Sequence, residues 1–322
     1  MHKKSIVLLS YGGETEYRRA IFCIFSLNAW GGHHIKENNV MIYTDNAIYF
    51  TRYLSEFPVE LIDLNKEDLE SMMGEFSFIH RIKVSVISLT FKKFPGQDLL
   101  FLDSDMFFTK YPSFISKSFT PGNCYMHKRE YSIKESVDIF TAYDQPHFPL
   151  AFIAYISSRD FSIGLTRRKF SENNYSWNSG VIGVAQDFSV YMSDVLRLTD
   201  DFYEHTKWFI SEQLAFSFVL QSTSKINPTN DVVLHYWSAA EKKIMDQQLL
   251  HVINDSNVAH LKRSKFMQGL IADAERKLKI NLVYSEAILA FSKRNWYYGL
   301  KKNVQLLFMK PKLLVSLWLK LK

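Results

Sequence analysis

Two aspartates, Asp103 and Asp105, stand between two apolar runs, Leu99–Leu102 and Met106–Phe108. Carboxylates in such a position are expected to be partly buried, and burying a carboxylate is costly unless it is paired or binds a cation. Aspartate oxygens suit Mg²⁺ or Mn²⁺, and a metal held by one or two carboxylates keeps open positions for diphosphate oxygens. The pattern therefore predicts a metal site that receives a diphosphate. The alternative is a strand-end turn in which an aspartate acts as a cap.

Further residues suited to chemistry lie on both sides of the acidic pair, in a fixed order. In chain order they are Arg81 and Lys83, the segment Trp177–Val184 with its Asn-Ser-Gly sequence, Glu212 with Gln213, and His235. Taken together with the acidic pair, these motifs resemble the nucleotide-sugar glycosyltransferases of the GT-A fold, especially family 8 and its relatives. The resemblance covers roughly residues 5–240.

The resemblance implies a metal site of three ligands. Asp103 and Asp105 match the acidic pair that holds the metal and touches the ribose, and His235 matches a late histidine that supplies the third ligand. An imidazole beside two carboxylates suits Mn²⁺, so Mn²⁺ or Mg²⁺ is the expected cofactor. The alternative for His235 is a core histidine in an aromatic strand.

The resemblance also implies contacts with the nucleotide-sugar donor, which is expected to be a UDP-sugar. Arg81 matches a donor-contacting arginine, and Asn178 matches a residue near the donor sugar and the reaction centre. Lys83 cannot share the helix face of Arg81, so one of the two is expected to face phosphate or sugar and the other to pair elsewhere. Ser104 is included among the donor contacts. Lys242 stands in for a diphosphate-binding lysine, because the family's usual Gly-x-x-Lys-Pro-Trp continuation is absent here.

Two residues at strand ends are candidates for contacts with the nucleoside. Tyr11 ends the first predicted strand, where the family places its base, and its ring could stack on a pyrimidine. Asp45 ends the second strand and could reach base or ribose. An ordinary core tyrosine and a turn cap are equally good interpretations of these two residues.

The expected reaction breaks the anomeric C–O bond and leaves negative charge on a nucleoside diphosphate, which a divalent cation stabilises. The sugar becomes oxocarbenium-like, and Asn178, Glu212 and Gln213 are the candidate groups that stabilise it. Glu212-Gln213 departs from the Asp-Gln or Asp-x-Asp usual in family 8, which leaves open which of the two faces the sugar. The resemblance implies retention of the anomeric configuration. An inverting enzyme would need a carboxylate base, for which Asp144, Asp160 and Glu172 are candidates.

Two other functions compete with glycosyl transfer. A nucleotidyltransferase of similar fold usually carries a glycine-rich loop with Lys or Arg after its first strand, whereas this chain has Gly12-Gly13 followed by Glu14. A non-catalytic, membrane-associated protein that binds sugar nucleotides is the second alternative. Metal-dependent UDP binding that is lost in Asp105→Asn would argue against a non-catalytic scaffold.

Apolar runs alternate with helical patterns along the first hundred residues, which predicts an α/β fold of the GT-A, Rossmann-like type with a mostly parallel sheet covered on both faces. In such sheets ligands bind at the carboxyl ends of the strands. Predicted strands are 5–10, 40–44, 59–63, 99–102, 123–127, 181–185 and 232–237. Predicted helices are 14–30, 66–73, 79–94, 188–198 and 211–221. The segment 143–178 is expected to be a loop region that faces the acceptor.

Composition supports a globular chain without an extensive nucleic-acid surface. Of 322 residues 47% are hydrophobic and 22% charged, with 12 Gly and 8 Pro, so a core can form and global disorder is excluded. Two cysteines, Cys23 and Cys124, favour a reducing compartment. The net charge is +6, but residues 293–322 contain eight Lys or Arg and no acid. The rest has 31 basic and 33 acidic residues, a net charge of −2, which argues against nucleic-acid binding.

The chain is therefore expected to form a catalytic domain over 1–290 and a basic, aromatic tail over 291–322. The tail interleaves Lys, Trp, Tyr and Leu, which suits attachment to an anionic membrane surface, and Pro311 is expected to divide it into two helical pieces. Each basic residue near such a surface contributes ~1 kcal/mol. The alternative is a helix packed on the domain. With no signal peptide and no run of about 18 apolar residues, the expected location is cytoplasmic, at the inner face of the cell membrane, with a glycan or lipid-linked acceptor.

Overall fold

The computed structural model describes residues 3–310. The chain divides into two compact units, Met1–His235 and Tyr236–Lys322, and each is described by itself. The predicted functional division into 1–290 and 291–322 stays a prediction.

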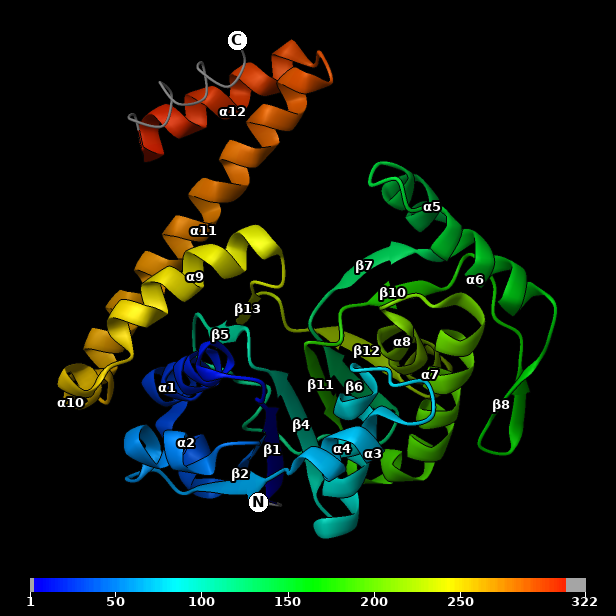
Figure 1. The fold of residues 1–322 in the computed structure, drawn as a ribbon, viewed down its shortest axis with the longest axis horizontal. Coiled ribbons are helices and arrows are strands. Elements are labelled where there is room, and N and C mark those ends of the chain that lie inside the picture. The colour runs from blue at the N-terminus through cyan, green and yellow to red at the C-terminus, as the bar shows by residue number, and fades with distance from the viewer. Residues whose placement is uncertain (1–2, 311–322) are drawn as a thin grey trace. The chain divides into compact units, whose positions relative to one another are not determined.

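The first unit is built on a seven-stranded sheet in the order β12-β6-β11-β4-β1-β2-β3. Its strands are β1 (Lys4–Leu9), β2 (Asn39–Thr44), β3 (Val59–Asp63), β4 (Asp98–Asp103), β6 (Asn123–Met126), β11 (Val181–Val184) and β12 (Lys225–Pro228). Neighbours pair in parallel except at β11, which is antiparallel to both β4 and β6. The predicted α/β class with a mostly parallel sheet is confirmed (Figure 1).

Helices cover both faces of this sheet because its strand residues alternate between two apolar cores. On one face, Val7 and Phe101 belong to the core packed against α4 (Arg81–Lys93), α7 (Met192–Thr206) and α8 (Ser211–Thr223). On the other face, Ile6 and Leu100 are fully buried on the side of α1 (Glu14–Glu37). The side-chain hydroxyl of Ser26 in α1 accepts a 2.9 Å hydrogen bond from the backbone N–H of Phe108.

Shorter elements connect the strands of this sheet. They are α2 (Ala47–Leu54), α3 (Lys66–Met73), β5 (Met106–Phe108), β7 (Arg129–Ser132), α5 (Ile133–Thr141), α6 (His147–Ser157), β8 (Phe161–Ile163), β9 (Thr166–Arg168), β10 (Tyr175–Trp177), η1 (Gln186–Tyr191) and β13 (Val233–His235). Three two-stranded sheets join β10 with β7, β13 with β5 and β8 with β9. The first two of these sheets build the site.

Two local predictions were wrong. The segment 143–178 is not a loop region, because it contains α6 and three short strands. Helix α1 does not end at Gly31 but kinks there, with φ −154° and ψ 53°, and continues to Glu37. The segment 188–198 is helical as predicted, and it is divided between η1 and the first half of α7.

The second unit is helical over its described residues. It consists of α9 (Ala239–Val252), η2 (Asp255–Asn257), α10 (Val258–Leu261), α11 (Ser264–Ser292) and α12 (Trp296–Met309). Figure 1 shows α12 folded back along the end of α11. Val283, Ala287 and Phe291 of α11 pack there with Leu306 of α12 in a small core. The predicted break at Pro311 lies outside the described residues.

Candidate metal centre

The three predicted metal ligands converge at the carboxyl end of β4. Asp103 is the last residue of β4, and Asp105 lies in the turn that leads to β5. Strand β13 pairs antiparallel with β5 and places His235 opposite Met106. As a result His235 Nε2 lies 3.0 Å from Asp105 Oδ1 and 3.9 Å from Asp103 Oδ2. One ligand atom from each residue lies within 4.8 Å of the other two.

Asn178 holds the opposite side of the histidine ring. It lies between β10 and β11, where its Oδ1 is 2.8 Å from His235 Nδ1 and also accepts a 3.1 Å hydrogen bond from the backbone N–H of Gly180. The carbonyl of Gly180 in turn accepts a 2.9 Å hydrogen bond from the backbone N–H of Asp103. The Asn-Ser-Gly motif is therefore fixed to the acidic pair by both backbone and side-chain bonds.

Lys83 reaches the same cluster from α4. Its Nζ lies 3.0 Å from Asp103 Oδ1 and 2.9 Å from Glu212 Oε1, and donates a 3.2 Å hydrogen bond to Ser179 Oγ. Arg81 diverges to the other side of the helix, where its Nε donates a 2.7 Å hydrogen bond to Asp200 Oδ1. The i, i+2 spacing thus separates the two cations as helix geometry requires.

The cluster carries more negative than positive charge. Burial raises the pKa of Asp103, and the neighbouring Asp105 adds to the rise while Lys83 opposes it. For Glu212, burial also raises the pKa, but Lys83, His80 and the hydrogen bond from Ser179 together outweigh it and the net shift is downward. Burial lowers the pKa of His235, yet Asp105 and Asp103 together outweigh it, so this pKa is raised. A divalent cation among these groups would relieve the acidic excess.

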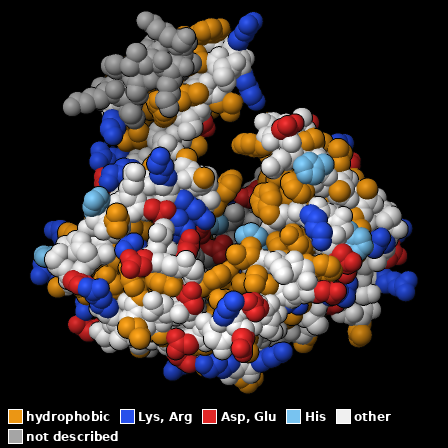
Figure 2. Space-filling view, viewed as in Figure 1, with side chains coloured by type: hydrophobic (Ala, Val, Ile, Leu, Met, Phe, Trp, Pro, Cys, Tyr) orange, Lys and Arg blue, Asp and Glu red, His pale blue; other side chains and the backbone are white. Residues whose placement is uncertain are grey.

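The donor set fits the predicted cation. Two carboxylates and one imidazole at this spacing match the ligand preferences of Mn²⁺, and the oxygens also suit Mg²⁺. Asp105 is only 6% exposed, and burial of a carboxylate to this degree is ordinary for a metal ligand. In Figure 2, acidic side chains lie recessed below the surrounding surface near the middle of the drawn face.

The predicted sugar-side groups lie directly behind these ligands. Glu212 and Gln213 occupy the first turn of α8, whose positive end favours a carboxylate. Glu212 Oε1 accepts a 2.6 Å hydrogen bond from Ser179 Oγ, and Gln213 Oε1 accepts a 3.4 Å bond from the backbone N–H of Ser179. The structure therefore brings Asn178, Glu212 and Gln213 together around one serine.

Glu130 is a residue of this cluster that the sequence prediction missed. Its Oε1 accepts a 3.1 Å hydrogen bond from Asn178 Nδ2, and its Oε2 accepts a 3.0 Å bond from Gln213 Nε2. A single glutamate in a polar strand carries no local signal. It reaches the site because β7 pairs with β10, which places Tyr131 opposite Ser176.

The two residues predicted to contact the nucleoside lie at the same carboxyl edge of the sheet, after β1 and β2. Asp45 accepts hydrogen bonds of 2.7 Å from the Tyr17 hydroxyl and 3.0 Å from the backbone N–H of Gly12. Tyr11 is half-buried, and burial together with Glu16 and Asp45 raises its pKa to about 12. Their predicted roles toward the base and ribose stay predictions.

The two remaining donor candidates are Ser104 and Lys242. Ser104 Oγ donates a 3.0 Å bond to Glu16 Oε2, and Lys242 lies on α9 in the second unit. Their predicted roles as donor contacts, and that of Arg81, stay predictions.

Comparison with known proteins finds solved structures only at low similarity. No family model and no curated protein match the sequence. Mouse xyloside xylosyltransferase 1 in its apo form is similar with a TM-score of 0.44 and 12% identity, over 70% of this chain and 85% of that one. The galactosyltransferase LgtC in complex with donor and acceptor sugar analogs is similar with a TM-score of 0.45 and 12% identity, over 82% and 95%.

The glycosyltransferase GlyE of Streptococcus pneumoniae TIGR4 has a TM-score of 0.47 and 12% identity, over 83% of this chain and 64% of that one. This chain therefore spans less than two thirds of GlyE. The names of these structures agree with the resemblance predicted from the motifs. At such identities nothing about their substrates transfers to this chain.

Proposed function

We propose that this chain is a metal-dependent glycosyltransferase that moves a sugar from a nucleotide-diphosphate sugar, most simply a UDP-sugar, to a glycan or lipid-linked acceptor with retention. One observation carries the proposal. The acidic pair Asp103 and Asp105 meets His235, which lies far away in the sequence, at the carboxyl edge of the sheet. This edge is where α/β folds bind their ligands.

Each residue around this centre would have a distinct role. Asp103, Asp105 and His235 would hold Mn²⁺ or Mg²⁺, which when bound supplies positive charge to a departing diphosphate. Lys83 fixes Asp103 and Glu212 in place and favours their ionised forms, because its ammonium contacts both. Asn178, Glu212 and Gln213 form the polar wall beside the ligands and would face the sugar.

A screen of nucleotide sugars for Mn²⁺-dependent hydrolysis tests the proposal. We expect at least one UDP-sugar to be hydrolysed, and we expect Asp103→Ala and Asp105→Asn to lower the rate at least 100-fold. The matched control is Asp231→Asn, because Asp231 is an exposed partner of Lys110. Equal rates in wild type and Asp105→Asn would refute the metal role. Nucleotide binding without any sugar transfer or hydrolysis would favour the non-catalytic alternative. Conversion of the nucleotide sugar to a nucleoside triphosphate and a sugar 1-phosphate, only when pyrophosphate is added, would favour a nucleotidyltransferase.

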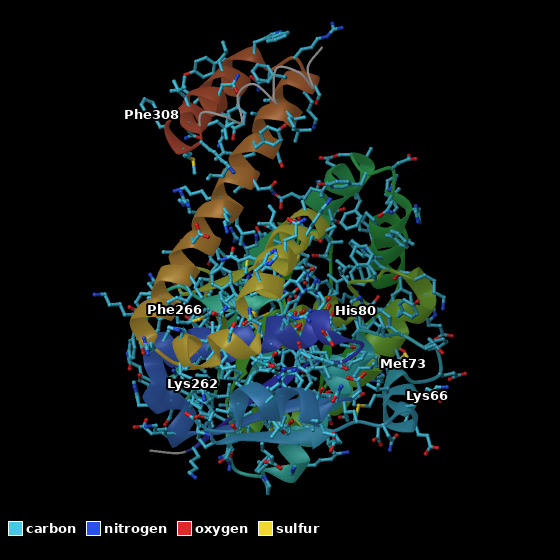
Figure 3. All side chains as sticks on the ribbon, turned by 60° about the vertical axis from the view of Figure 1, so that its left-hand side comes forward. Lys66, Met73, His80, Lys262, Phe266 and Phe308 are labelled. Carbon is cyan, nitrogen blue, oxygen red and sulfur yellow. The ribbon has the colours of Figure 1, made fainter. Side chains whose placement is uncertain are left out.

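We also propose that the chain attaches to the anionic inner face of the cell membrane, next to a lipid-linked acceptor. The support is the surface of α12, whose exposed apolar residues we call the α12 stripe: Trp296, Tyr297, Leu300, Val304, Leu307 and Phe308. In Figure 3 the labelled Phe308 projects from α12, and Figure 2 shows basic and hydrophobic side chains together on this unit. Among residues 3–310, no helix is both long and apolar enough to cross a bilayer.

Cosedimentation of the full chain with lipid vesicles tests the attachment. We expect binding to vesicles that contain phosphatidylglycerol and weaker binding to vesicles of phosphatidylcholine alone, because the basic residues add electrostatic attraction only in the first case. Absence of binding to both would refute the proposal.

A further inference from the structure

The side-chain amide of Asn178 can take only one orientation in this structure. Its Oδ1 faces the backbone N–H of Gly180 at 3.1 Å, which can only donate. Its Nδ2 faces Glu130 Oε1 at 3.1 Å, which as a carboxylate can only accept. Exchanging oxygen and nitrogen would place donor against donor on one side and leave two acceptors facing each other on the other.

This orientation determines that Nδ1 of His235 carries a proton. The ring contacts Asn178 Oδ1 through Nδ1 at 2.8 Å, and an amide oxygen is only an acceptor. Nδ1 must therefore be the donor. Nε2 faces a carboxylate oxygen, so in the metal-free ring it carries a proton as well, and it is the nitrogen whose lone pair a cation can take once that proton leaves. That atom is the one that faces Asp105, at 3.0 Å, on the metal side of the ring.

Glu130 lies at the outer end of this series of contacts, and each of its two carboxylate oxygens accepts a hydrogen bond from a side-chain amide. Its second oxygen, Oε2, accepts a 3.0 Å hydrogen bond from Gln213 Nε2, which also donates 2.8 Å to Ser176 Oγ. The orientation of Gln213 is fixed in the same way, since its Oε1 faces the backbone N–H of Ser179 at 3.4 Å. One carboxylate thus orients both amides that flank the site.

We propose that Glu130 is a positioning residue: through Asn178 it fixes the neutral form of His235 that has its proton on Nδ1 and its free lone pair on Nε2, where a divalent cation binds. The proposal deepens the function proposed above and rests on it for the metal. Groups that hold the far nitrogen of a ligating histidine commonly raise metal affinity 10- to 100-fold. Glu130 acts here one residue further out, with an amide as the relay.

The variant Glu130→Gln tests this relay. The NH₂ groups of Asn178 and Gln213 both donate to Glu130 in the wild type. A glutamine at this position offers one oxygen and one NH₂, so one of the two neighbouring NH₂ groups then faces another donor. When Asn178 rotates in response, its NH₂ meets Nδ1 of His235 and the ring keeps a proton on Nε2 alone. We expect Mn²⁺ affinity of the full chain, measured by calorimetry without any substrate, to fall roughly 10- to 100-fold.

A double variant tests the same relay by rescue. In Glu130→Gln with Asn178→Asp, the amide of residue 130 donates to one oxygen of residue 178 and accepts from Gln213. The other oxygen of residue 178 accepts from the Gly180 N–H and from His235. Every hydrogen bond is restored and the net charge is unchanged. We expect Mn²⁺ affinity to return to within a fewfold of wild type, whereas Asn178→Asp alone sets two carboxylates against each other and stays weak.

Nitrogen-15 NMR of the His235 ring in the metal-free chain separates the two proposals. We expect protons on both ring nitrogens in wild type and in the double variant, and a proton on Nε2 alone in Glu130→Gln. Glu70→Gln, which changes an exposed partner of Lys66, is the control and should leave ring protonation and affinity unchanged. A wild-type ring without a proton on Nδ1, or no rescue by the double variant, overturns the role of Glu130. The expected ring protonation without Mn²⁺ binding or hydrolysis would overturn the proposed function instead.

Discussion

The positive charge of Lys83 compensates two carboxylates on the acidic side of the site. Its ammonium contacts Asp103 and Glu212 at 3.0 and 2.9 Å, and its side chain is only 11% exposed. Burial lowers the pKa of Lys83, but the two carboxylates outweigh it, so the net pKa shift is upward and the lysine stays charged. Removing one partner of a buried ionic network leaves the others without compensation.

We therefore predict that Lys83→Met lowers the free energy of unfolding by about 3–5 kcal/mol when chelator is present. Urea denaturation measures this loss. Added Mn²⁺ should restore part of the stability, since the cation replaces the missing positive charge between the carboxylates. The control is Lys93→Met, which breaks an exposed pair with Glu60 and should cost under about 1 kcal/mol. Equal losses in the two variants would contradict the buried network.

The residues of the site were predictable to different degrees. The ligands Asp103, Asp105 and His235 belong to motifs whose types and order are visible in the sequence, and the structure places them together. Glu130 was not predictable, because its role depends on a strand pairing that no local pattern encodes. Helix spacing predicted that Arg81 and Lys83 diverge, but only the fold decides that Lys83 is the one that enters the site.

At the scale of elements, the turn that leads into β11 explains why the Asn-Ser-Gly motif ends in glycine. A Cβ at Gly180 would lie 2.6 Å from Nδ1 and 2.7 Å from Cε1 of His235, and 3.0 Å from Asn178 Oδ1. Real Cβ atoms do not approach other atoms so closely. The glycine thus leaves room for the contact between His235 and Asn178.

We predict that Gly180→Ala lowers Mn²⁺ affinity about tenfold or more, because the methyl group displaces the imidazole from its place beside Asn178. Calorimetric titration of the full chain measures the affinity, and circular dichroism checks that the fold is kept. Gly269→Ala is the matched control, since a Cβ at that helical position meets nothing within 4 Å. An unchanged affinity in Gly180→Ala would show that the ring has freedom that the structure does not indicate.

A second prediction at this scale concerns the pH dependence of stability and rests on the kinked end of α1. His34 packs over Gly31, where a Cβ would lie 2.7 Å from its Cδ2, and its Nε2 is buried without a hydrogen-bond partner among residues 3–310. Burial lowers the pKa of His34 from 6.5 to about 4, with His33 contributing next. The unfolded chain therefore binds more protons than the folded chain between these values, and stability falls as the pH drops below 6.5.

We expect this histidine to cost about 1–2 kcal/mol of stability between pH 7 and pH 5. The variant His34→Gln cannot titrate, so its stability should change less than that of wild type over the same interval. Urea denaturation at each pH gives the difference between the two curves. Parallel curves would mean that His34 is protonated in the folded chain.

Local signals account for the elements that were predicted well. Strand β3 and helix α3 have the predicted bounds, because Asn65 caps α3 by accepting a 2.8 Å bond from the Asp68 N–H, and Gly74 ends it with φ 68°. Helix α6 escaped prediction because it is apolar on every side and carries Pro149 in its first turn, where proline is tolerated. The kink in α1 escaped because paired glycines normally end a helix.

At the scale of the whole molecule, the second unit shows one sequence signal that was missed and one that was recognised. No element is predicted over 239–290, yet Met267, Ile271, Ala274 and Leu278 of α11 recur with helical spacing and are all buried. The basic and aromatic segment that follows was recognised from composition, and its described part forms α12. Buried Gly299, Asn303 and Leu306 turn one side of α12 inward, which leaves the α12 stripe exposed.

The final prediction separates charge from apolar contact in the proposed membrane attachment. Phe308 is 83% exposed in the α12 stripe, and burying such a ring in the membrane interface contributes about 1.5–3 kcal/mol. Phe308→Glu loses this term and adds a negative charge, whereas Gln305→Glu adds the same charge outside the stripe. At about 0.5 M salt, screening weakens the effect of the charge. We expect Phe308→Glu to bind phosphatidylglycerol vesicles roughly tenfold more weakly than wild type there, while Gln305→Glu stays close to wild type. Equal binding by the two variants would show that the stripe does not enter the membrane.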